Sequence, residues 1–259
     1  MNTSVATDAP ALARAADRLR SLHRRGEPLV LVNVWDAASA RRVEAAGARA
    51  LATSSAAIAA ALGVPDDDTM GPELAFGAVR RIAAGASVPV TADVEAGYGL
   101  SAADLVEELL GAGAVGCNLE DSDHSRPGRL IDADAAAGRL ADVRREARRA
   151  GVDIVLNARI DTFFHGGASD PEALVDETVR RARLYLAAGA DVVFPVRVAD
   201  PATAAQLVAA LDAHVNVGLG PSTTVAEMAA AGVSRISLGP GPHARAMAEL
   251  DRQAEQLLR

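Results

Sequence analysis

Short apolar runs bounded by glycine or polar residues recur along the chain. They are rich in Val, Leu and Ile and show no strict alternation, which is typical of strands covered on both faces of a parallel sheet. The runs occupy residues 29–34, 48–54, 88–93, 114–120, 153–159, 191–196, 214–220 and 234–239. The pattern therefore predicts a parallel sheet of eight strands.

Helical patterns lie between these runs. Several begin after Asp, Ser or Thr and end at Gly, which are the residues that favour the two ends of a helix. The predicted helices cover residues 37–47, 102–113, 171–189, 201–214 and 223–232. The sequence also predicts an extra helix at 9–25 and a terminal amphipathic helix at 243–259.

This alternation predicts an α/β fold, a (β/α)8 barrel of the TIM type. Such barrels run to about 250 residues, so residues 1–259 are expected to form one barrel domain. A doubly wound open sheet is the alternative. It is less favoured because the first strand is not followed by a dinucleotide-type glycine fingerprint.

Composition narrows the classes of partner. Aromatic residues make up only 3% of the chain, so the core must consist mainly of Ala, Val, Leu and Ile. A net charge of −8 argues against a nucleic-acid or anionic membrane surface. Cys117 is the single cysteine, which excludes an internal disulfide. With no apolar run of membrane-spanning length and no secretory pattern at the start, we expect a cytoplasmic protein.

The chain contains no lysine, and all 26 basic residues are arginine. A Schiff-base lysine and a Walker-type phosphate lysine are therefore excluded. Arginine instead offers a planar fork that suits a carboxylate or a phosphate.

Polar residues gather where the predicted strands end. In a (β/α)8 barrel, the carboxyl ends of the strands and the following loops build the site. These residues are Asn33, Trp35, Asp36, Thr53, Ser54, Ser55, Asp93, Glu95, Asn118, Glu120, Asp121, Asn157, Arg159, Asp161 and Arg197.

Three acids among them predict a metal site. Asp93, Glu95 and Glu120 follow adjacent strands, and alternation along a strand predicts that Asp93 and Glu95 face the same side. Three carboxylates repel one another unless a cation lies among them. Oxygen ligands without a His/Cys cluster favour Mg²⁺, or Mn²⁺, over zinc. The alternative is that these acids pair with arginines or cap helices.

Two arginines follow strands on the same face. Arg159 is the natural partner for a substrate carboxylate, and its alternative is an ion pair with Asp161 or Glu120. Arg197 either points into the site or pairs with Asp200.

Six segments, taken together and in this order, identify a family resemblance. They are NVWDAASARRVEAAGARA, SSAAIAAALGVPD, TADVEAGYG, NLED, NARIDTF and YLAAGADVVF. The chain resembles the phosphoenolpyruvate mutase/isocitrate lyase superfamily over nearly its whole length. The resemblance implies a barrel that is usually tetrameric, with a C-terminal helix exchanged between neighbouring subunits. It also implies Mg²⁺-bound 2-oxo acids, enolate-like species and the making or breaking of a C–C or P–C bond.

The resemblance also assigns roles to residues. It places Asp93, Glu95 and Glu120 around the metal, Glu95 being one methylene longer than the family's acid, and Asp66 near the metal-bound substrate. It implies catalytic roles for Asp66 and Arg159, with Arg159 holding the substrate carboxylate and Tyr98 at the mouth of the pocket. The predicted substrate-binding residues are Ser54, Ser55, Tyr98, Asn118, Arg126 and Arg159.

The chain departs from the family in its gating loop. Isocitrate and methylisocitrate lyases carry a cysteine in a K-(K/R)-C-G-H run, whereas Cys117 lies inside the fourth strand and is expected to be a small buried residue. Phosphoenolpyruvate mutases use a lysine and an asparagine in the loop after the LED segment. Here that loop, DSDHSRPGRLID at 121–132, has neither and is shorter.

Other residues in and near this loop are candidates for the missing chemistry. His124 is a candidate catalytic acid or base near neutral pH, and its alternative is an exposed loop histidine. Arg126 or Arg129 could bind a second carboxylate or a phosphonate when the loop closes, and the alternative is a solvated charge. His165 could border the pocket.

Three functions remain open from the sequence. The leading one is a Mg²⁺-dependent carbon–carbon lyase that acts on a small 2-oxo acid through an enolate, either oxaloacetate decarboxylase-like or a small-acid lyase. The second is P–C chemistry, as a phosphonomutase or a phosphonopyruvate hydrolase. The third is a non-catalytic carboxylate-binding barrel. The expected partners are a small carboxylate substrate and further copies of the chain, in a homotetramer.

Overall fold

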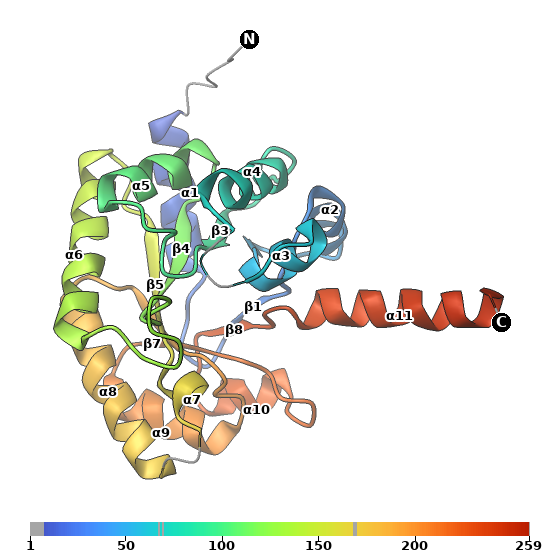
Figure 1. Cartoon of the computed structure of the whole chain (residues 1–259). Helices are drawn as coiled ribbons and strands as arrows, with labels where there is room; N and C mark the ends of the chain where they lie inside the picture. The colour runs from blue at the N-terminus through green and yellow to red at the C-terminus, as the bar shows by residue number, and fades with distance from the viewer. Residues whose placement is uncertain (1–7, 67, 69, 168–169, 259) are drawn as a thin grey trace.

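Eight parallel strands form a nearly closed barrel surrounded by helices in the computed structural model (Figure 1). The structure describes residues 8–66, 68, 70–167 and 170–258. The strands are β1 (Leu29–Leu31), β2 (Leu51–Ala52), β3 (Val90–Asp93), β4 (Gly116–Glu120), β5 (Val155–Ile160), β6 (Val192–Pro195), β7 (His214–Val217) and β8 (Arg235–Ser237). The strands are hydrogen-bonded in the order β1-β8-β7-β6-β5-β4-β3-β2. One parallel bridge between Val34, just after β1, and Thr53, just after β2, joins the two ends of this order. The predicted (β/α)8 fold is confirmed.

The helices lie outside this barrel. They are α1 (Ala9–Ser21), α2 (Ala37–Ala45), α3 (Ser55–Leu62), α4 (Pro72–Ala83), α5 (Ala102–Gly111), α6 (Ala133–Arg149), α7 (Thr162–His165), α8 (Pro171–Ala187), α9 (Pro201–Leu211), α10 (Val225–Ala230) and α11 (Gly241–Leu258). All the predicted helices are present, most of them shorter than predicted. Helices α3, α4, α6 and α7 were not predicted. Only the first residue of helix α3 is polar, so it has no polar face that would show a helical period.

Helix α1 covers the end of the barrel where the strands begin. Its residues Ala16 and Leu19 are fully buried. The Arg20 guanidinium donates to Asp191 Oδ1 at 3.0 Å and to the carbonyl oxygen of Asp153 at 2.7 Å, just before β6 and β5. The extra N-terminal helix is therefore confirmed, and the opposite end of the barrel is left for the site.

Helix α11 projects away from the barrel (Figure 1). None of its described residues is buried, and Met247, Leu250, Leu257 and Leu258 are exposed. The predicted terminal helix is present. In the described part of the chain, no helix combines the length and apolar character needed to cross a membrane.

The barrel interior contains a polar layer below the site. Arg235 is fully buried, and its Nη2 donates to Asn118 Oδ1 at 3.0 Å. The same oxygen accepts from Asn157 Nδ2 at 2.7 Å. Burial lowers the pKa of Arg235 to about 10, and the nearby charge of Asp93 opposes this shift. Cys117 is also fully buried, as predicted, and burial raises its thiol pKa to about 12.

Candidate active site

A cavity of about 320 Å³ lies at the carboxyl ends of the strands. It is lined by Ser55, Asp66, Glu95, Glu120, Ser122, Asp123, His124, Pro127, Gly128, Arg159, Phe164 and His165. These residues follow β2, β3, β4 and β5 or end them, so the cavity lies on the face where this fold places active sites. The sequence-predicted residues Ser55, Asp66, Glu95, Glu120, His124 and Arg159 meet here.

Asp93 ends β3 and is held by the neighbouring strand end. Its Oδ2 accepts hydrogen bonds from the Ser55 backbone N–H at 3.2 Å and from the Ser55 hydroxyl at 3.1 Å. Its backbone N–H donates to Thr53 Oγ1 at 2.9 Å. The carboxylate of Asp93 is therefore fixed in orientation by the segment between β2 and α3.

Glu95 reaches the cavity by a different route from the one predicted. Strand β3 ends at Asp93, and Glu95 has a left-handed backbone with φ of 48°, so strand alternation does not set its direction. Its side chain is buried, and Oε2 accepts a hydrogen bond from the Asp68 backbone N–H. Its Oε1 is buried without a hydrogen-bond partner among the described residues. Burial, with the nearby charges of Asp66 and Glu120, raises the Glu95 pKa to about 8.

The turn after Glu95 depends on glycine. Gly97 and Gly99 have φ of 93° and 70°, a region that residues with a Cβ rarely adopt. A Cβ on Gly97 would also collide with Arg139 Nη2. The GYG segment therefore lets the chain turn beside the cavity.

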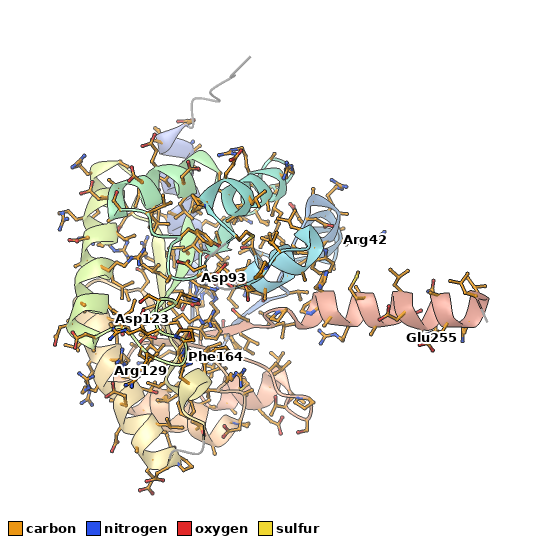
Figure 2. The ribbon with its side chains drawn as sticks, viewed as in Figure 1. Arg42, Asp93, Asp123, Arg129, Phe164 and Glu255 are labelled. Carbon is orange, nitrogen blue, oxygen red and sulfur yellow. The ribbon has the colours of Figure 1, made fainter. Side chains whose placement is uncertain are left out.

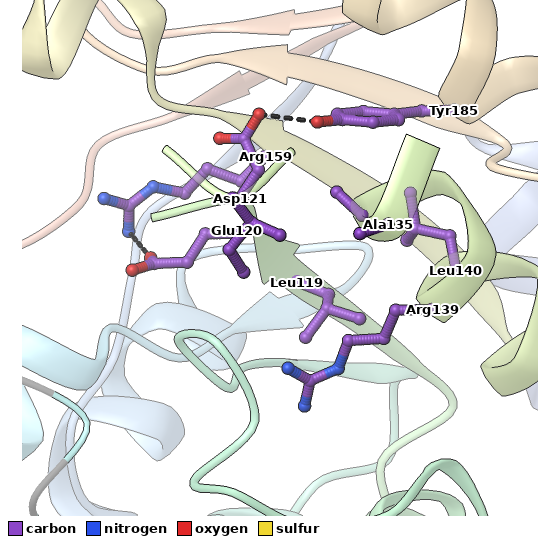
Figure 3. Close-up of a pocket in the computed structure, with 10 residues that line it drawn as sticks. Leu119, Glu120, Asp121, Ala135, Arg139, Leu140, Arg159 and Tyr185 are labelled. Carbon is purple, nitrogen blue, oxygen red and sulfur yellow. Dashed lines mark hydrogen bonds and ion pairs between the residues drawn. The ribbon is translucent and has the colours of Figure 1, made fainter. Parts of the chain in front are cut away.

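Glu120 contacts two basic side chains. Arg159 Nη1 lies 2.6 Å from its Oε2 (Figure 3), and His124 Nε2 lies 2.7 Å from its Oε1. Burial raises the Glu120 pKa, while Arg159 and the His124 hydrogen bond oppose that shift. The same hydrogen bond is the main cause that raises the His124 pKa. His124 is thus a cavity residue rather than an exposed loop histidine.

The arrangement that could hold a cation differs from the predicted trio. A carboxylate oxygen of Asp68, a carboxylate oxygen of Glu95 and a ring nitrogen of His124 all lie within 4.8 Å of one another. Of the predicted trio, only Glu95 belongs to this group. Asp93 is hydrogen-bonded to Ser55 instead. Glu120 is paired with Arg159 and hydrogen-bonded to His124. The unpartnered, buried Glu95 Oε1 fits a divalent cation in this position.

Asp68 is a residue that sequence reasoning missed. It lies in the acidic run PDDD after α3, of which only Asp66 was singled out. The run was the available signal, but nothing in its spacing indicates which of the acids turns toward Glu95. The nitrogen donor of His124 also changes the predicted all-oxygen set, because imidazole suits transition metals, whereas Mg²⁺ prefers oxygen ligands.

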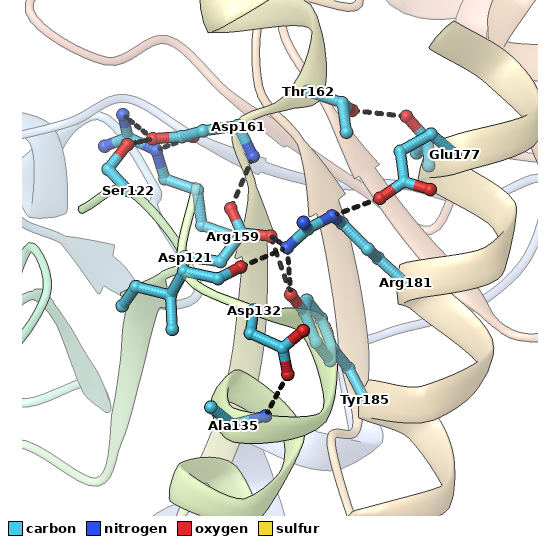
Figure 4. Close-up of polar contacts among 12 residues, drawn as sticks. Asp121, Ser122, Asp132, Ala135, Arg159, Asp161, Thr162, Glu177, Arg181 and Tyr185 are labelled. Carbon is cyan, nitrogen blue, oxygen red and sulfur yellow. Dashed lines mark hydrogen bonds and ion pairs between the residues drawn. The ribbon is translucent and has the colours of Figure 1, made fainter. Parts of the chain in front are cut away.

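Arg159 is already paired on both sides. Its Nε and Nη2 lie 2.7 and 3.0 Å from the two oxygens of Asp161 (Figure 4), while its Nη1 faces Glu120 (Figure 3). These carboxylates raise its pKa further, although burial opposes the shift. The ion-pair alternative therefore describes Arg159 in this structure, and its role toward a substrate carboxylate stays a prediction.

A buried network fixes Asp161 from behind. Asp121 Oδ1 accepts from the Asp161 backbone N–H at 2.8 Å. Asp121 Oδ2 accepts from the Tyr185 hydroxyl at 2.7 Å and from Arg181 Nη1 at 3.0 Å (Figure 4). Helix α8 thereby positions the end of β5. Sequence reasoning missed Tyr185 and Arg181, since their spacing within α8 gives no sign of a partner 64 or 60 residues away.

The loop 121–132 covers the cavity. Ser122 and Leu130 form an antiparallel bridge, and Ser122, Asp123 and His124 line the cavity with the turn at Pro127. Ser122 Oγ lies 2.9 Å from His165 Nε2, so His165 borders the pocket as predicted. Arg126 instead points to solvent and pairs with Asp123 at 2.6 Å, which is the solvated alternative.

Besides Arg126, three predicted binding residues lie outside the cavity lining. Ser54 caps α3, with its hydroxyl oxygen accepting from the Ala57 N–H at 3.3 Å. Tyr98 is not at the mouth, because its ring is buried edge-on against Phe76. Asn118 lies in the barrel interior, where Arg235 holds its side-chain oxygen. Each of these polar side chains meets a structural requirement that the motif alone does not reveal.

Comparison with known proteins identifies the family of the chain. Residues 19–258 match the family model described as phosphoenolpyruvate phosphomutase. A crystal structure from Burkholderia cenocepacia J2315, described as a candidate phosphonomutase, has 46% sequence identity and a TM-score of 0.88, covering 95% of this chain and 99% of that one.

Two further relatives carry C–C chemistry in their names. Oxaloacetate acetylhydrolase in complex with the product oxalate has 26% identity and a TM-score of 0.83, covering 95% of this chain and 87% of that one. The Corynebacterium glutamicum protein named "Probable 2-methylisocitrate lyase 2" is 34% identical over 181 residues, which are 67% of this chain and 56% of that protein.

Proposed function

Because the chain belongs to the phosphoenolpyruvate phosphomutase family, within the phosphoenolpyruvate mutase/isocitrate lyase superfamily, we propose that it is a divalent-metal-dependent lyase. Its reaction breaks or forms a C–C bond of a small 2-oxo acid through an enolate. The observation that carries the proposal is Glu95, a buried carboxylate with one unpartnered oxygen beside Asp68 and His124 in the cavity.

The residues that would hold the metal are Asp68, Glu95 and His124. A bound divalent ion supplies Lewis-acid stabilisation of the charge that develops on an enolate oxygen. Mg²⁺ or Mn²⁺ satisfies the carboxylates, and the His124 nitrogen favours Mn²⁺ of the two. With His124 as a metal ligand, its predicted acid–base role passes to another group.

Asp66 is the residue that we assign to proton transfer. Its carboxyl lines the cavity, and burial together with the charge of Asp93 raises its pKa. The neighbouring Ser55 hydroxyl opposes the shift. Asp66 therefore holds a proton more readily than an aspartate free in water and can deliver it to the enolate carbon.

The remaining residues position this site. Asp161 and Glu120 fix the Arg159 guanidinium at the cavity wall, where it adds positive charge without leaving its partners. The loop 121–132 covers the site and excludes water from the enolate. This chemistry needs no covalent intermediate, so it is compatible with a chain that contains no lysine.

P–C chemistry is the second candidate. It is favoured by the 46% identity with the Burkholderia structure described as a candidate phosphonomutase. The loop 121–132 lacks the lysine and asparagine of mutases, which is why we place C–C cleavage first.

The proposal is tested by turnover on three substrates. Pyruvate release is measured from oxaloacetate and phosphonopyruvate, and pyruvate and succinate release from 2-methylisocitrate, each with Mn²⁺, with Mg²⁺ and with EDTA. We expect metal-dependent turnover of a C–C substrate, reduced at least about 100-fold in Glu95→Gln. The exposed Glu249→Gln is the matched control and keeps full activity. Phosphate release from phosphonopyruvate alone would favour the second candidate, and equal rates in EDTA would exclude the metal role.

We also propose a homotetramer in which α11 is exchanged between subunits. The projecting helix with its exposed Met247 and Leu250 supports this assembly, since such a face is stabilised by burial against another copy.

A further inference from the structure

Arg197 has an unusual backbone at the end of β6. The Val198 N–H donates to the carbonyl oxygen of Pro195 at 3.2 Å, which closes a tight turn with Arg197 at its third position. Arg197 has φ of 70°, a left-handed value for which glycine is the usual residue at this place in a turn. Strained residues of this kind cluster at functional sites.

The Arg197 side chain extends over an aromatic ring at the cavity. Its Cζ lies 4.3 Å from the centre of the Phe164 ring, and Phe164 lines the cavity with 41% of its surface exposed. The Arg159 Cζ lies 5.7 Å from the same ring centre. The two guanidinium carbons are therefore no farther apart than the sum of these distances, about 10 Å.

Arg197 differs from Arg159 and Arg126 in its charge balance. Arg159 is offset by Asp161 and Glu120, and Arg126 by Asp123. No ion pair joins Arg197 to a carboxylate within residues 8–66, 68, 70–167 and 170–258. Asp200, the alternative partner, accepts from the Thr203 N–H at 2.8 Å and caps α9 instead.

We propose that Arg197 and Phe164 form a subsite for the distal carboxylate of a dicarboxylic 2-oxo acid. The ring holds the guanidinium at the mouth by a cation–π contact, and the planar fork receives the carboxylate that does not bind at the metal end. Because the two guanidinium carbons lie no more than about 10 Å apart, a chain of four or five carbons is long enough to place one carboxylate near each of them. This inference rests on the proposed function, because that function places the other end of the substrate at the metal.

Ligands with and without the distal carboxylate test this subsite. Pyruvate and 3,3-difluorooxaloacetate are titrated calorimetrically into the Mn²⁺-loaded full chain. We expect Arg197→Gly to weaken difluorooxaloacetate at least about tenfold and to leave pyruvate within about twofold. Glycine tolerates the left-handed backbone, so the melting temperature is not expected to fall. Arg197→Lys retains the charge without the fork and is expected to restore part of the affinity.

A charge-matched variant and a packing variant complete the design. Arg42→Gln on α2, far from the cavity in Figure 2, removes the same charge and is expected to change neither affinity. Phe164→Leu is expected to weaken difluorooxaloacetate more than pyruvate. Equal weakening of both ligands by Arg197→Gly, no weakening of either, or a wild-type protein that does not prefer the diacid would overturn the subsite.

Failure of the proposed function gives a different result. If oxaloacetate is not turned over but Arg197→Gly still weakens difluorooxaloacetate selectively, the subsite stands and the lyase proposal is wrong. If oxaloacetate is turned over and Arg197→Gly changes neither binding nor KM, the lyase stands and the subsite is wrong.

Discussion

Among single residues, Glu95 carries the least compensated charge of the site. Its carboxylate is buried, has one oxygen without a partner among the described residues, and has a pKa raised to about 8. A carboxylate in such a place requires either a proton or a cation. The same carboxylate that would bind the metal therefore also affects the stability of the metal-free protein.

The Glu95 pKa predicts how stability depends on pH in EDTA. The folded protein keeps the Glu95 proton up to about pH 8, whereas the unfolded chain loses it near the ordinary value of 4.5. Between these values unfolding releases a proton, so this residue makes the free energy of unfolding fall as pH rises. Glu95→Gln removes that fall. Urea denaturation should show the variant more stable than wild type above pH 8 and equal to it below pH 4.5. A difference that is independent of pH would contradict the assignment.

Ser54 and Ser55 are adjacent residues with separable roles. Ser54→Ala removes the hydroxyl that caps α3 and should lower the free energy of unfolding by about 1 kcal/mol, with normal kcat. Ser55→Ala removes the hydroxyl that holds Asp93 Oδ2 and should lower kcat/KM with a smaller loss of stability. Urea denaturation and steady-state kinetics of the two variants measure both effects, and the reverse pattern would restore the predicted binding role of Ser54.

At the scale of elements, the site depends on contacts between strand ends and helices that follow other strands. Helix α8 sends Tyr185 and Arg181 to Asp121 at the end of β4, and Asp121 in turn holds the backbone at the end of β5 (Figure 4). One helix thus sets the relative position of two strand ends. Arg159 and Glu120, which are paired in register across β5 and β4, take their places from that arrangement.

Tyr185→Phe tests this link between elements. The change removes a hydrogen bond to a buried carboxylate and should lower the free energy of unfolding by about 1.5 to 3 kcal/mol. Tyr98→Phe is the matched control, because the described residues offer its hydroxyl no hydrogen bond, and a smaller loss is expected. Equal losses in the two variants, measured by urea denaturation, would remove Tyr185 from the network.

At the scale of the whole molecule, α11 is the element that the barrel does not explain. It projects from the barrel (Figure 1), contributes nothing to the core and exposes Leu250, Leu257 and Leu258. Burial of those side chains against another copy would stabilise an assembly by about 1.5 to 3 kcal/mol for each fully covered leucine.

Leu250→Glu is expected to reduce the assembly. A charge on the apolar face opposes burial, so light scattering should show a lower molar mass than for wild type. Gln256→Glu adds the same charge on the other side of α11 and should leave the mass unchanged. A monomeric wild-type protein, or an equal response to both variants, would exclude the proposed exchange of α11.

The sequence by itself determined the barrel and the face on which the site lies. Apolar runs that alternate with capped helices recur too regularly for another fold class, and polar residues mark the strand ends because side chains there need no apolar cover. Glu95, Glu120 and Arg159 were found in this way, whereas the family resemblance indicated Asp66 and the loop 121–132 supplied His124.

Only the tertiary structure decided how these residues pair. Asp68 joins Glu95 through a loop, Arg159 is taken by Asp161 and Glu120, and Tyr98 turns into the core. Such pairings depend on distances between elements that are far apart in the chain and on backbone angles such as that of Arg197. Spacing along the sequence sets which residues reach the site, whereas packing sets which of their charges remain free.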